Sequence, residues 1–296
     1  MRRRLDGVLL LDKPAGLGSN AALQAVKRLY RAAKAGHAGT LDPLASGLLP
    51  VLFGEATKFS QFALDADKAY VARARLGVTT TTADAEGEVL EQKPCTVHGA
   101  DIEPVLAAFR GEIEQVPPMY SALKHGGRPL YALARAGREV PRAPRRIRVH
   151  ALELLHFTAD SVELRIRCSK GTYIRTLVED IGRALGCGAH VAALRRTATG
   201  AFRIEDAVTL EQLQSDTAAA RDARLLPLER LLGGLPRVDL PAAEAERFAR
   251  GQALHMAQAP AGQCSVYGQQ GRLLGLGEGR AEGELRPRRL VNHASG

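Results

Sequence analysis

The most constraining feature of this sequence is a run of glycines, prolines and apolar residues, Gly36-His-Ala-Gly-Thr-Leu-Asp-Pro-Leu-Ala-Ser-Gly-Leu-Leu-Pro50. Glycine adopts backbone conformations that other residues resist, and proline fixes φ. The run holds too many of both for a regular helix or strand, and too few polar residues for an exposed loop. We therefore expect a buried loop with a constrained backbone.

Asp42 is the single carboxylate of this loop, and leucines flank it on both sides. A carboxylate in apolar surroundings is costly unless it is paired or used in chemistry, so Asp42 is a candidate functional residue. An alternative is that Asp42 caps a short helix beginning at Pro43, because Asp before proline is a common helix start. The two interpretations are compatible.

The chain is basic, with a formal net charge of +9, and much of the excess lies in one segment. Between Met119 and Arg148, eight Lys and Arg residues accompany a single acid, Glu139. A solvated charged face usually mixes both signs, so the segment favours contact with an anionic polymer such as nucleic acid. Its glycines and prolines indicate an inserted arm outside the core.

The sequence gives no indication of a metal site, a disulfide framework or a membrane span. Its four cysteines are scattered without a C-x-x-C pair, which is typical of reduced core residues. No secretory segment follows the N-terminal arginines, and no apolar run reaches spanning length. Metal-ligand spacing is also absent around His37. We expect a cytoplasmic protein that holds no metal.

Residue periodicity predicts the elements around the loop. Gly7 to Asp12 is a compact apolar run typical of a buried strand, and Ser19 or Asn20 offers an N-cap for a following helix. Lys68 to Leu76 alternates with period two, which predicts a strand with Tyr70 on its apolar side. Core packing is the default interpretation of Tyr70 from this pattern alone.

A strand–turn–helix unit is predicted further along the chain. Alternation from Val162 to Cys168 indicates a strand, and apolar spacing indicates a helix from Ile174 to Leu185. Arg175 then lies in the first helical turn, where a cation opposes the helix dipole. One candidate partner is Glu179, in an i,i+4 pair of about 0.3–0.5 kcal/mol. An ionised Asp42 is the other.

The composition changes around Gly233-Gly-Leu-Pro236. Before this boundary, the predicted strands and helices follow one another along residues 1–236. Beyond the boundary we expect one short helix and brief strands punctuated by glycines. This pattern predicts a small β-rich domain over residues 237–296.

Five motifs together resemble the bacterial TruB-type tRNA pseudouridine synthases, and they occur in the family order. They are Leu11-Asp-Lys-Pro-Ala-Gly16, Gly36-His-Ala-Gly-Thr-Leu-Asp-Pro-Leu-Ala-Ser-Gly47, Gly54-Glu-Ala-Thr-Lys-Phe59, Ala69-Tyr-Val71 and Cys168-Ser-Lys-Gly-Thr-Tyr-Ile-Arg175. The resemblance extends from about Gly7 to Asn292. One departure is Gly18, where the family usually has Ser or Thr, so that position offers no hydroxyl.

The resemblance implies isomerisation of uridine 55 in the tRNA T loop to pseudouridine, without a metal or an organic cofactor. It implies the mixed α/β pseudouridine synthase fold, with a central mixed sheet and an RNA-gripping thumb near residues 119–147. The tail would be a PUA-like RNA-binding domain. The expected partner is tRNA, bound by a monomer that makes no membrane contact.

The resemblance also implies roles for site residues. Asp42 would attack the ribose C1′ or the base C6 of a flipped-out uridine, and both routes remain open. Arg175 would keep Asp42 ionised, while Tyr70 would support the base and help to remove the C5 proton. The other expected substrate contacts are His37, Tyr173, Leu194 and Lys13. The expected RNA backbone contacts are Lys124, Arg138, Arg142, Arg145 and Arg146.

Two other functions fit parts of the sequence. An RNA-binding or RNA-folding module without catalysis would use the same basic arm, and the set of Asp42, Tyr70 and Arg175 argues against it. The third hypothesis is a hydrolase with two carboxylates, Asp42 and Asp84. The basic arm counts against a neutral sugar as its substrate.

Overall fold

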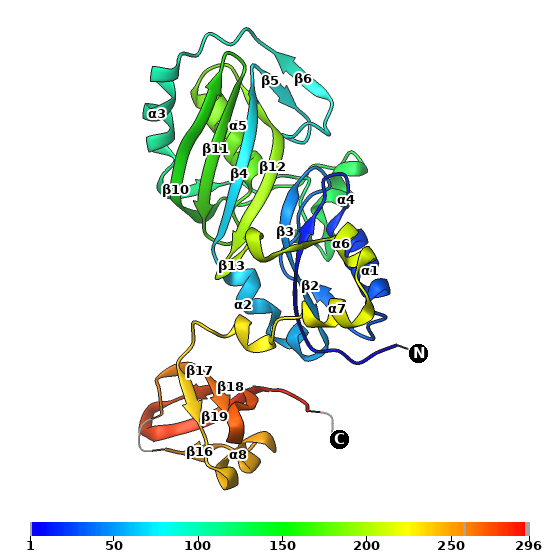
Figure 1. The fold of residues 1–296 in the computed structure, drawn as a ribbon. Helices are drawn as coiled ribbons and strands as arrows, with labels where there is room; N and C mark the ends of the chain where they lie inside the picture. The colour runs from blue at the N-terminus through cyan, green and yellow to red at the C-terminus, as the bar shows by residue number, and fades with distance from the viewer. Residues whose placement is uncertain (1, 257–258, 294–296) are drawn as a thin grey trace.

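The structure, a computed structural model, describes residues 2–256 and 259–293. Figure 1 shows an elongated molecule in which a large sheet with flanking helices lies above a smaller C-terminal sheet. All four cysteines are free thiols, in agreement with the sequence-based prediction. Among the described residues, no helix is both long and apolar enough to cross a membrane.

The central sheet is mixed and contains ten strands. Eight of them follow the order β14-β1-β3-β12-β4-β11-β10-β7, while β2 pairs with β3 and β13 pairs with β12. The β1–β14 and β3–β12 pairs are parallel, and the other neighbours are antiparallel. The strands are β1 (Gly7–Lys13), β2 (Ala35–His37), β3 (Ser46–Phe53), β4 (Lys68–Leu76), β7 (Gly111–Gln115), β10 (Arg145–Thr158), β11 (Ser161–Cys168), β12 (Ala189–Thr199), β13 (Phe202–Arg203) and β14 (Val208–Thr209).

Helices cover this sheet and its edges. The helix α3 packs against β10 and α5 packs against β12, whereas α1 contacts β2 and α6. The prediction for α5 is confirmed, because it begins at Ile174 and places Arg175 in its first turn. The α-helices are α1 (Ser19–Leu29), α2 (Ser60–Asp65), α3 (Gly99–Ala108), α4 (Leu130–Arg135), α5 (Ile174–Ala184), α6 (Leu210–Ser215), α7 (Ala218–Ala223) and α8 (Ala242–Ala249). The 3-10 helices are η1 (Gly54–Phe59), η2 (Ile204–Asp206), η3 (Leu228–Leu231), η4 (Gln269–Gly271) and η5 (Ala281–Gly283).

The prediction that residues 36–50 form no strand is wrong at both ends of the segment. Gly36 belongs to β2, and β3 contains both Gly47 and Pro50. Gly47 has φ +101°, and a Cβ there would lie 2.3 Å from the carbonyl oxygen of Arg196, so glycine is required by close strand packing. Pro50 contributes its carbonyl oxygen to the Ala38 N–H at 2.9 Å, a bond that needs no donor from proline.

The start of α1 also differs from the prediction that Ser19 or Asn20 is its N-cap. Gly18 is the N-cap residue, and Ser19 is the first residue of the helix. The Ser19 hydroxyl accepts from the Leu41 N–H at 2.7 Å and lies 2.8 Å from the Leu41 carbonyl oxygen, to which it donates. The Ser19 hydroxyl, next to Gly18, therefore links α1 to Leu41, the residue that precedes Asp42.

The C-terminal domain is β-rich, as the sequence predicts, with strand order β15-β17-β18-β19-β16. It shares a hydrophobic core with the larger part of the chain, where Tyr267 and Leu273 join Val8 and Phe59. Lys58 Nζ also donates to the Leu290 carbonyl at 3.1 Å. The exact boundary at residue 236 stays a prediction. The strands are β15 (Arg237–Asp239), β16 (Leu254–His255), β17 (Gly262–Tyr267), β18 (Leu273–Gly279) and β19 (Glu284–Leu290).

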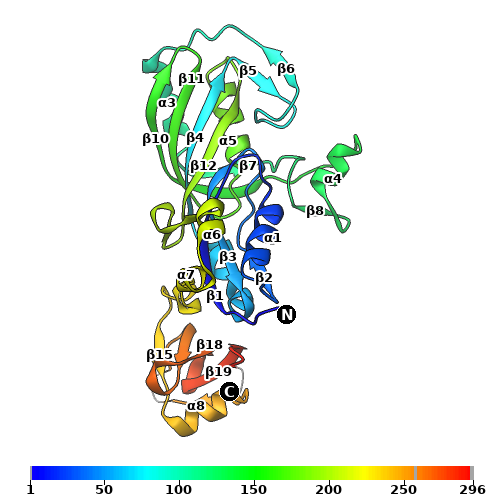
Figure 2. The ribbon, with the colours of Figure 1, turned by 45° about the vertical axis from the view of Figure 1, so that its right-hand side comes forward.

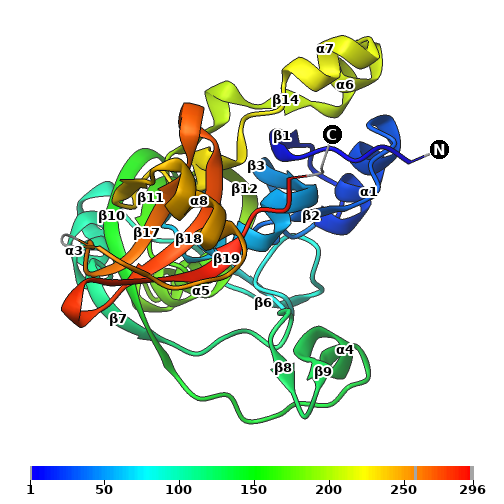
Figure 3. The same cartoon turned by 90° about the horizontal axis from the view of Figure 1, so that it is seen from below.

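The basic segment projects from the central sheet, as Figures 2 and 3 show. It contains α4 and the short hairpin of β8 (Lys124–His125) and β9 (Arg128–Pro129). Arg145 begins β10 and pairs with Gln115 of the edge strand β7, so the last residues of the segment belong to the central sheet, and the approximate thumb bounds of 119–147 stay a prediction. A second hairpin, β5 (Val78–Thr80) and β6 (Val89–Gln92), lies beyond the end of β4.

Candidate active site

Asp42 and Arg175 form an ion pair, with Arg175 Nε 2.9 Å from Asp42 Oδ2. Asp42 lies in the loop between β2 and β3, and Arg175 extends from the first turn of α5. A second carboxylate, Asp84, lies 3.6 Å from the same nitrogen. The predicted pairing with Asp42 is confirmed, and within the described chain Arg175 pairs with these aspartates instead of Glu179.

Arg175 is held in one orientation by its remaining nitrogens. Its Nη1 donates to the Thr82 carbonyl at 2.9 Å, and its Nη2 donates to the Tyr120 carbonyl at 2.7 Å. The side chain is buried, so these bonds compensate for the loss of water around the guanidinium. The two aspartates offset the unfavourable position of a cation in the first turn of a helix.

Asp42 is placed where its charge is accessible but poorly solvated. Burial raises the pKa of Asp42, and the positive charge of Arg175 lowers it in opposition. The side chain remains 41% exposed, so a substrate can reach it. No helix begins at Pro43: the Ala45 N–H bonds the Asp42 carbonyl in a turn, and the helix-cap interpretation of Asp42 is wrong.

Asp42 lines a cavity of about 360 Å³ together with Arg175, Tyr70, Tyr173 and Leu194. These side chains converge from the loop, α5, β4, the N-cap of α5 and β12. The volume lies in the range of small-molecule sites. A neighbouring cavity of about 610 Å³ shares Asp42 and Arg175 and extends toward the basic segment.

The two tyrosines of the cavity are protonated phenols at neutral pH. Burial raises the pKa of Tyr70, although the charge of Arg196 lowers it in part. Burial also raises the pKa of Tyr173. Gln115, on β7, holds the Tyr173 backbone by accepting from its N–H at 2.8 Å and donating to its carbonyl at 3.0 Å. Sequence reasoning missed Gln115, because no local pattern distinguishes it.

Arg196 is a second residue that sequence reasoning missed. It is 1% exposed on β12, between β3 and β4, and it also lines the smaller cavity. Its Nε donates to the Leu48 carbonyl at 2.7 Å, and its Nη2 donates to the Gly39 carbonyl at 3.0 Å. Arg196 therefore holds both ends of the loop that carries Asp42. The available signal was an arginine inside a strand pattern, at Leu194-Arg-Arg196.

Lys13 and His37 lie outside the walls of both cavities. Lys13 is fully buried, and its Nζ donates to the carbonyls of Pro14 and Leu17. Burial lowers the pKa of Lys13 to about 8, and the negative charge of Asp42 opposes that shift. His37 ends β2, and burial lowers its pKa. The structure thus brings together Asp42, Tyr70, Tyr173, Arg175 and Leu194, but not these two residues.

Protein-family profiles match successive parts of the chain. A TruB family pseudouridylate synthase N-terminal domain matches residues 27–174, a tRNA pseudouridylate synthase B C-terminal domain matches 175–233, and a pseudouridine synthase II TruB C-terminal profile matches 236–291. The tRNA pseudouridine synthase B of Aromatoleum aromaticum is 56% identical over 291 residues, which are 98% of this chain and 94% of that protein. This chain belongs to the TruB family of tRNA pseudouridine synthases.

Other TruB-family relatives match at similar length. The tRNA pseudouridine synthase B of Methylobacillus flagellatus is 54% identical over 295 residues, which are 99% of this chain and 98% of that protein. A chain in the crystal structure of a Cbf5-Nop10-Gar1 complex superposes with a TM-score of 0.73 at 29% identity. That match covers 97% of this chain and 84% of the other. The mixed α/β pseudouridine synthase fold is thereby confirmed.

The residues of the basic segment that are predicted to contact RNA differ in their exposure to solvent. Arg142 is half-buried, donates to the Pro117 carbonyl at 3.2 Å and pairs with Glu139 at 2.9 Å. It therefore supports the base of the segment. The side chains exposed to solvent are Lys124, Arg138, Arg145 and Arg146. Within residues 2–256 and 259–293, no three His, Cys, Asp or Glu side chains gather as a metal site would require.

Proposed function

We propose that this TruB-family chain converts uridine 55 in the tRNA T loop to pseudouridine, with Asp42 as the nucleophile. The observation that carries the proposal is the Asp42–Arg175 pair, which lines a cavity of about 360 Å³ beside aromatic and apolar walls. A carboxylate held by a fixed cation can be ionised and still exposed to a substrate carbon. The family membership supplies the reaction class.

The uridine must leave its stack before Asp42 can reach it, at a cost of a few kcal/mol. In one route the carboxylate attacks C1′, the C1′–N1 bond breaks, and the uracil anion turns within the cavity. Its C5 then bonds to C1′ and displaces Asp42, after which the C5 proton is lost and N1 gains a proton. In the other route the carboxylate adds to C6 before the base turns. Substrate and product are isomers, so neither route needs an oxidant or a reductant.

Three wall residues have roles in this proposal. Tyr70 lines the cavity, and its ring would support the uracil while its phenol would help to remove the C5 proton. Tyr173 and Leu194 also line the cavity and would confine the base. His37 would fill the space that the flipped base leaves, by contact from outside the cavity wall. Lys13 would act through the turn that it supports.

RNA binding would use surfaces on both parts of the chain. The exposed cations of the basic segment would contact the tRNA backbone as a thumb. Residues 237–296 would form a PUA-like RNA-binding domain, next to the catalytic domain of residues 1–236. In this proposal the protein acts as a monomer.

The direct test uses unmodified tRNA transcripts and a chemical readout of pseudouridine at single-nucleotide resolution. We expect pseudouridine at position 55 of the wild-type transcript and none in a transcript with cytidine at that position. A product at another uridine would contradict the substrate assignment. Tight binding without any pseudouridine would favour the RNA-binding module, and release of free uracil would favour a hydrolase.

A further inference from the structure

A groove at the C-terminal end of α1 gathers cations that the proposed site does not use. Its volume is about 400 Å³, and its lining includes Arg2, Lys27, Arg28 and Arg31. The exposed stripe of α1 leads to it, from Asn20 through Gln24. A helical spacing of three or four residues places these side chains on one face. The stripe therefore changes from neutral to basic as it runs away from the catalytic loop.

The groove is formed by two segments of chain. The N–H of Arg3 donates to the Arg31 carbonyl at 2.7 Å, and the N–H of Ala33 donates to the Arg3 carbonyl at 2.8 Å. This pairing brings Arg2 beside the end of α1. Within residues 2–256 and 259–293, Arg3 pairs with Asp222, whereas the four groove cations have no carboxylate within 4.0 Å. Their mutual repulsion is thus not offset by neighbouring acids.

Arg31 occupies a backbone conformation that favours glycine. Its φ is +50°, one of three positive values among the non-glycine residues of the described chain. Its N–H bonds the Arg28 carbonyl and the Ala32 N–H bonds the Lys27 carbonyl, which is the Schellman arrangement that usually places glycine at this position. An arginine here is unfavourable for the fold, which indicates that its side chain serves another purpose.

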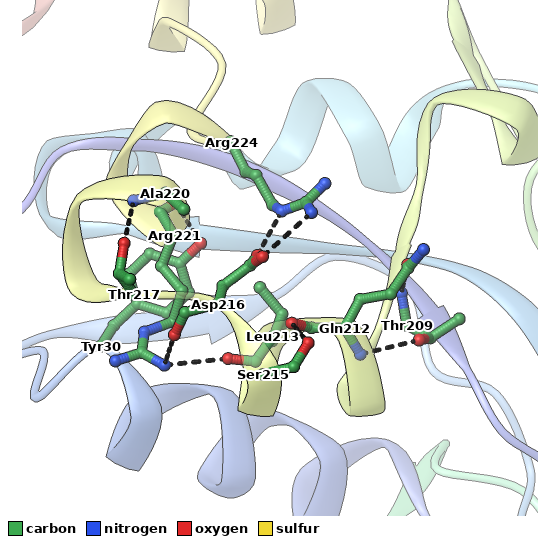
Figure 4. A network of polar contacts seen from close by, with 10 residues as sticks. All are labelled: Tyr30, Thr209, Gln212, Leu213, Ser215, Asp216, Thr217, Ala220, Arg221 and Arg224. Carbon is green, nitrogen blue, oxygen red and sulfur yellow. Dashed lines mark hydrogen bonds and ion pairs between the residues drawn. The ribbon is translucent and has the colours of Figure 1, made fainter.

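The end of α1 is also fixed in place. The C-cap residue Tyr30 is 1% exposed, and its hydroxyl donates to the Arg221 carbonyl at 2.6 Å. Figure 4 shows Arg221 continuing this network by donating to the carbonyls of Leu213 and Asp216. The backbone at this end of α1 is therefore held in place, which lowers the cost of ordering it around a ligand.

Favourable interaction with the helix dipole explains only part of this arrangement. Cations in the last turn of a helix are stabilised by the dipole, which accounts for Lys27 and Arg28. It does not account for Arg2, which comes from another segment, or for the strained backbone of Arg31. Four unpaired cations around one concave surface fit an extended polyanion better.

We propose that this groove binds the phosphate backbone of tRNA at a point outside the nucleotides held in the active site. This inference rests on the proposed function for the identity of the polyanion. Ser19 bonds Leu41 next to Asp42, and the eleven residues of α1 span about 16 Å, so the groove lies well beyond a flipped uridine. Figures 1, 2 and 3 place α1 and α4 toward the same side of the molecule, so one RNA can contact both.

The first test compares two triple variants of the full-length protein. Lys27→Ala/Arg28→Ala/Arg31→Gly removes three groove cations. Arg73→Ala/Arg165→Ala/Arg167→Ala removes three exposed cations from strands β4 and β11 and serves as the control. The affinity of each for unmodified full-length tRNA and for an isolated T-arm hairpin is measured across a range of salt concentrations.

We expect the groove variant to bind full-length tRNA more weakly, with the salt slope reduced by roughly 0.7–0.9 for each lost phosphate contact. Its affinity for the T-arm hairpin and its single-turnover rate on that hairpin should match those of the control. Equal salt slopes for both variants on full-length tRNA would overturn the inference. It would also be overturned if the groove variant lost as much affinity for the hairpin as for full-length tRNA. A wild-type protein that makes no pseudouridine but shows the slope difference would reject the proposed function and leave the groove contact intact.

The second test uses Arg31→Gly alone, because the two possible roles of Arg31 predict different results. Glycine relieves the positive φ, so the Tm should be equal to or higher than that of the wild type. Affinity for full-length tRNA should nevertheless fall. A variant with unchanged tRNA affinity and salt slope would show that Arg31 has no part in RNA binding.

Discussion

Arg196 binds the loop that carries Asp42 by donating from Nη2 to the Gly39 carbonyl at 3.0 Å. The same guanidinium donates from Nε to the Leu48 carbonyl at 2.7 Å, on the far side of Asp42 in the sequence. Two bonds from one rigid group thus fix the width of the loop. β12 lies between β3 and β4, and Arg196 is the register partner of Tyr70 on β4. Arg196 therefore also fixes the position of the Asp42 loop relative to Tyr70.

Arg196→Lys should therefore reduce catalysis more than binding. Lysine keeps the charge but cannot reach both carbonyls in the fork geometry, and each buried carbonyl left unpaired costs about 1–3 kcal/mol. We expect a lower Tm, a single-turnover rate reduced at least about tenfold and a tRNA Kd within about threefold of the wild type. The matched control is Arg195→Lys, which alters an ion pair with Asp12 on a half-exposed side chain and should cost under about 1 kcal/mol. Equal rates for both variants would contradict the positioning role.

Gly47→Ala should destabilise the protein strongly. The residue has φ +101°, and its Cβ would lie 2.3 Å from the Arg196 carbonyl oxygen, so strain and steric overlap act together. We expect a loss of about 3 kcal/mol in the free energy of unfolding, measured by chemical denaturation. Gly16→Ala is the control, because φ is +79° there but nothing lies within 4 Å of the added carbon, and it should cost about 1–2 kcal/mol. Similar losses of stability in Gly47→Ala and Gly16→Ala would show that β3 and β12 can move apart to accommodate the added carbon.

The acid limb of the pH–rate profile should depend on Asp84. In the proposed mechanism Asp42 acts in its ionised form, so activity is expected above its pKa in the folded protein and is expected to be lost as the pH falls through that value. Burial first, and then the negative charge of Asp84, raise the pKa of Asp42 against the effect of Arg175. Asp84→Asn removes the negative charge that raises the pKa of Asp42. The acid limb of the profile should therefore move to lower pH, whether or not the plateau rate changes. A limb that stays in place or moves to higher pH in single-turnover assays would contradict this electrostatic account.

The cations of the basic segment should separate into two groups. Arg138, Arg145 and Arg146 are exposed, and their replacement with Ala should flatten the salt dependence of tRNA binding by roughly 0.7–0.9 per lost contact. Arg142→Ala removes the bond to Pro117 and the pair with Glu139, and should loosen the segment, seen as faster proteolysis. An unchanged salt slope in the triple variant would mean that these arginines form only a solvated surface.

The parts of the fold with local periodicity could be predicted from the sequence. The apolar run of β1, the alternation of β4 and the apolar stripe of α5 each match the side chains that the element buries. The Asp42–Arg175 pair was one of two predicted alternatives, because a first-turn cation opposes the helix dipole and its local pair with Glu179 would be weak.

The features that could not be predicted from the sequence depend on contacts between distant segments of the chain. Gly47 and Pro50 disfavour a strand locally, yet β3 forms because β1 pairs with it from Gly47 to Phe53. The local signal for Arg196, an arginine inside a strand pattern, did not reveal its role, because that role comes from the register of β12 against β3. The core shared by Tyr267 and Phe59 was also missed, because a change of composition at residue 236 says nothing about packing across it.

The central claim is that Asp42 is the nucleophile, and Asp42→Asn tests it most directly. The amide keeps the size of the side chain but loses the charge and nearly all nucleophilicity. The measurement is single-turnover pseudouridine formation on unmodified tRNA, with a melting curve and a tRNA Kd on the same preparation. We expect a folded protein with near wild-type affinity and pseudouridine formation at background. A folded Asp42→Asn protein that forms pseudouridine at a rate near that of the wild type would contradict the account.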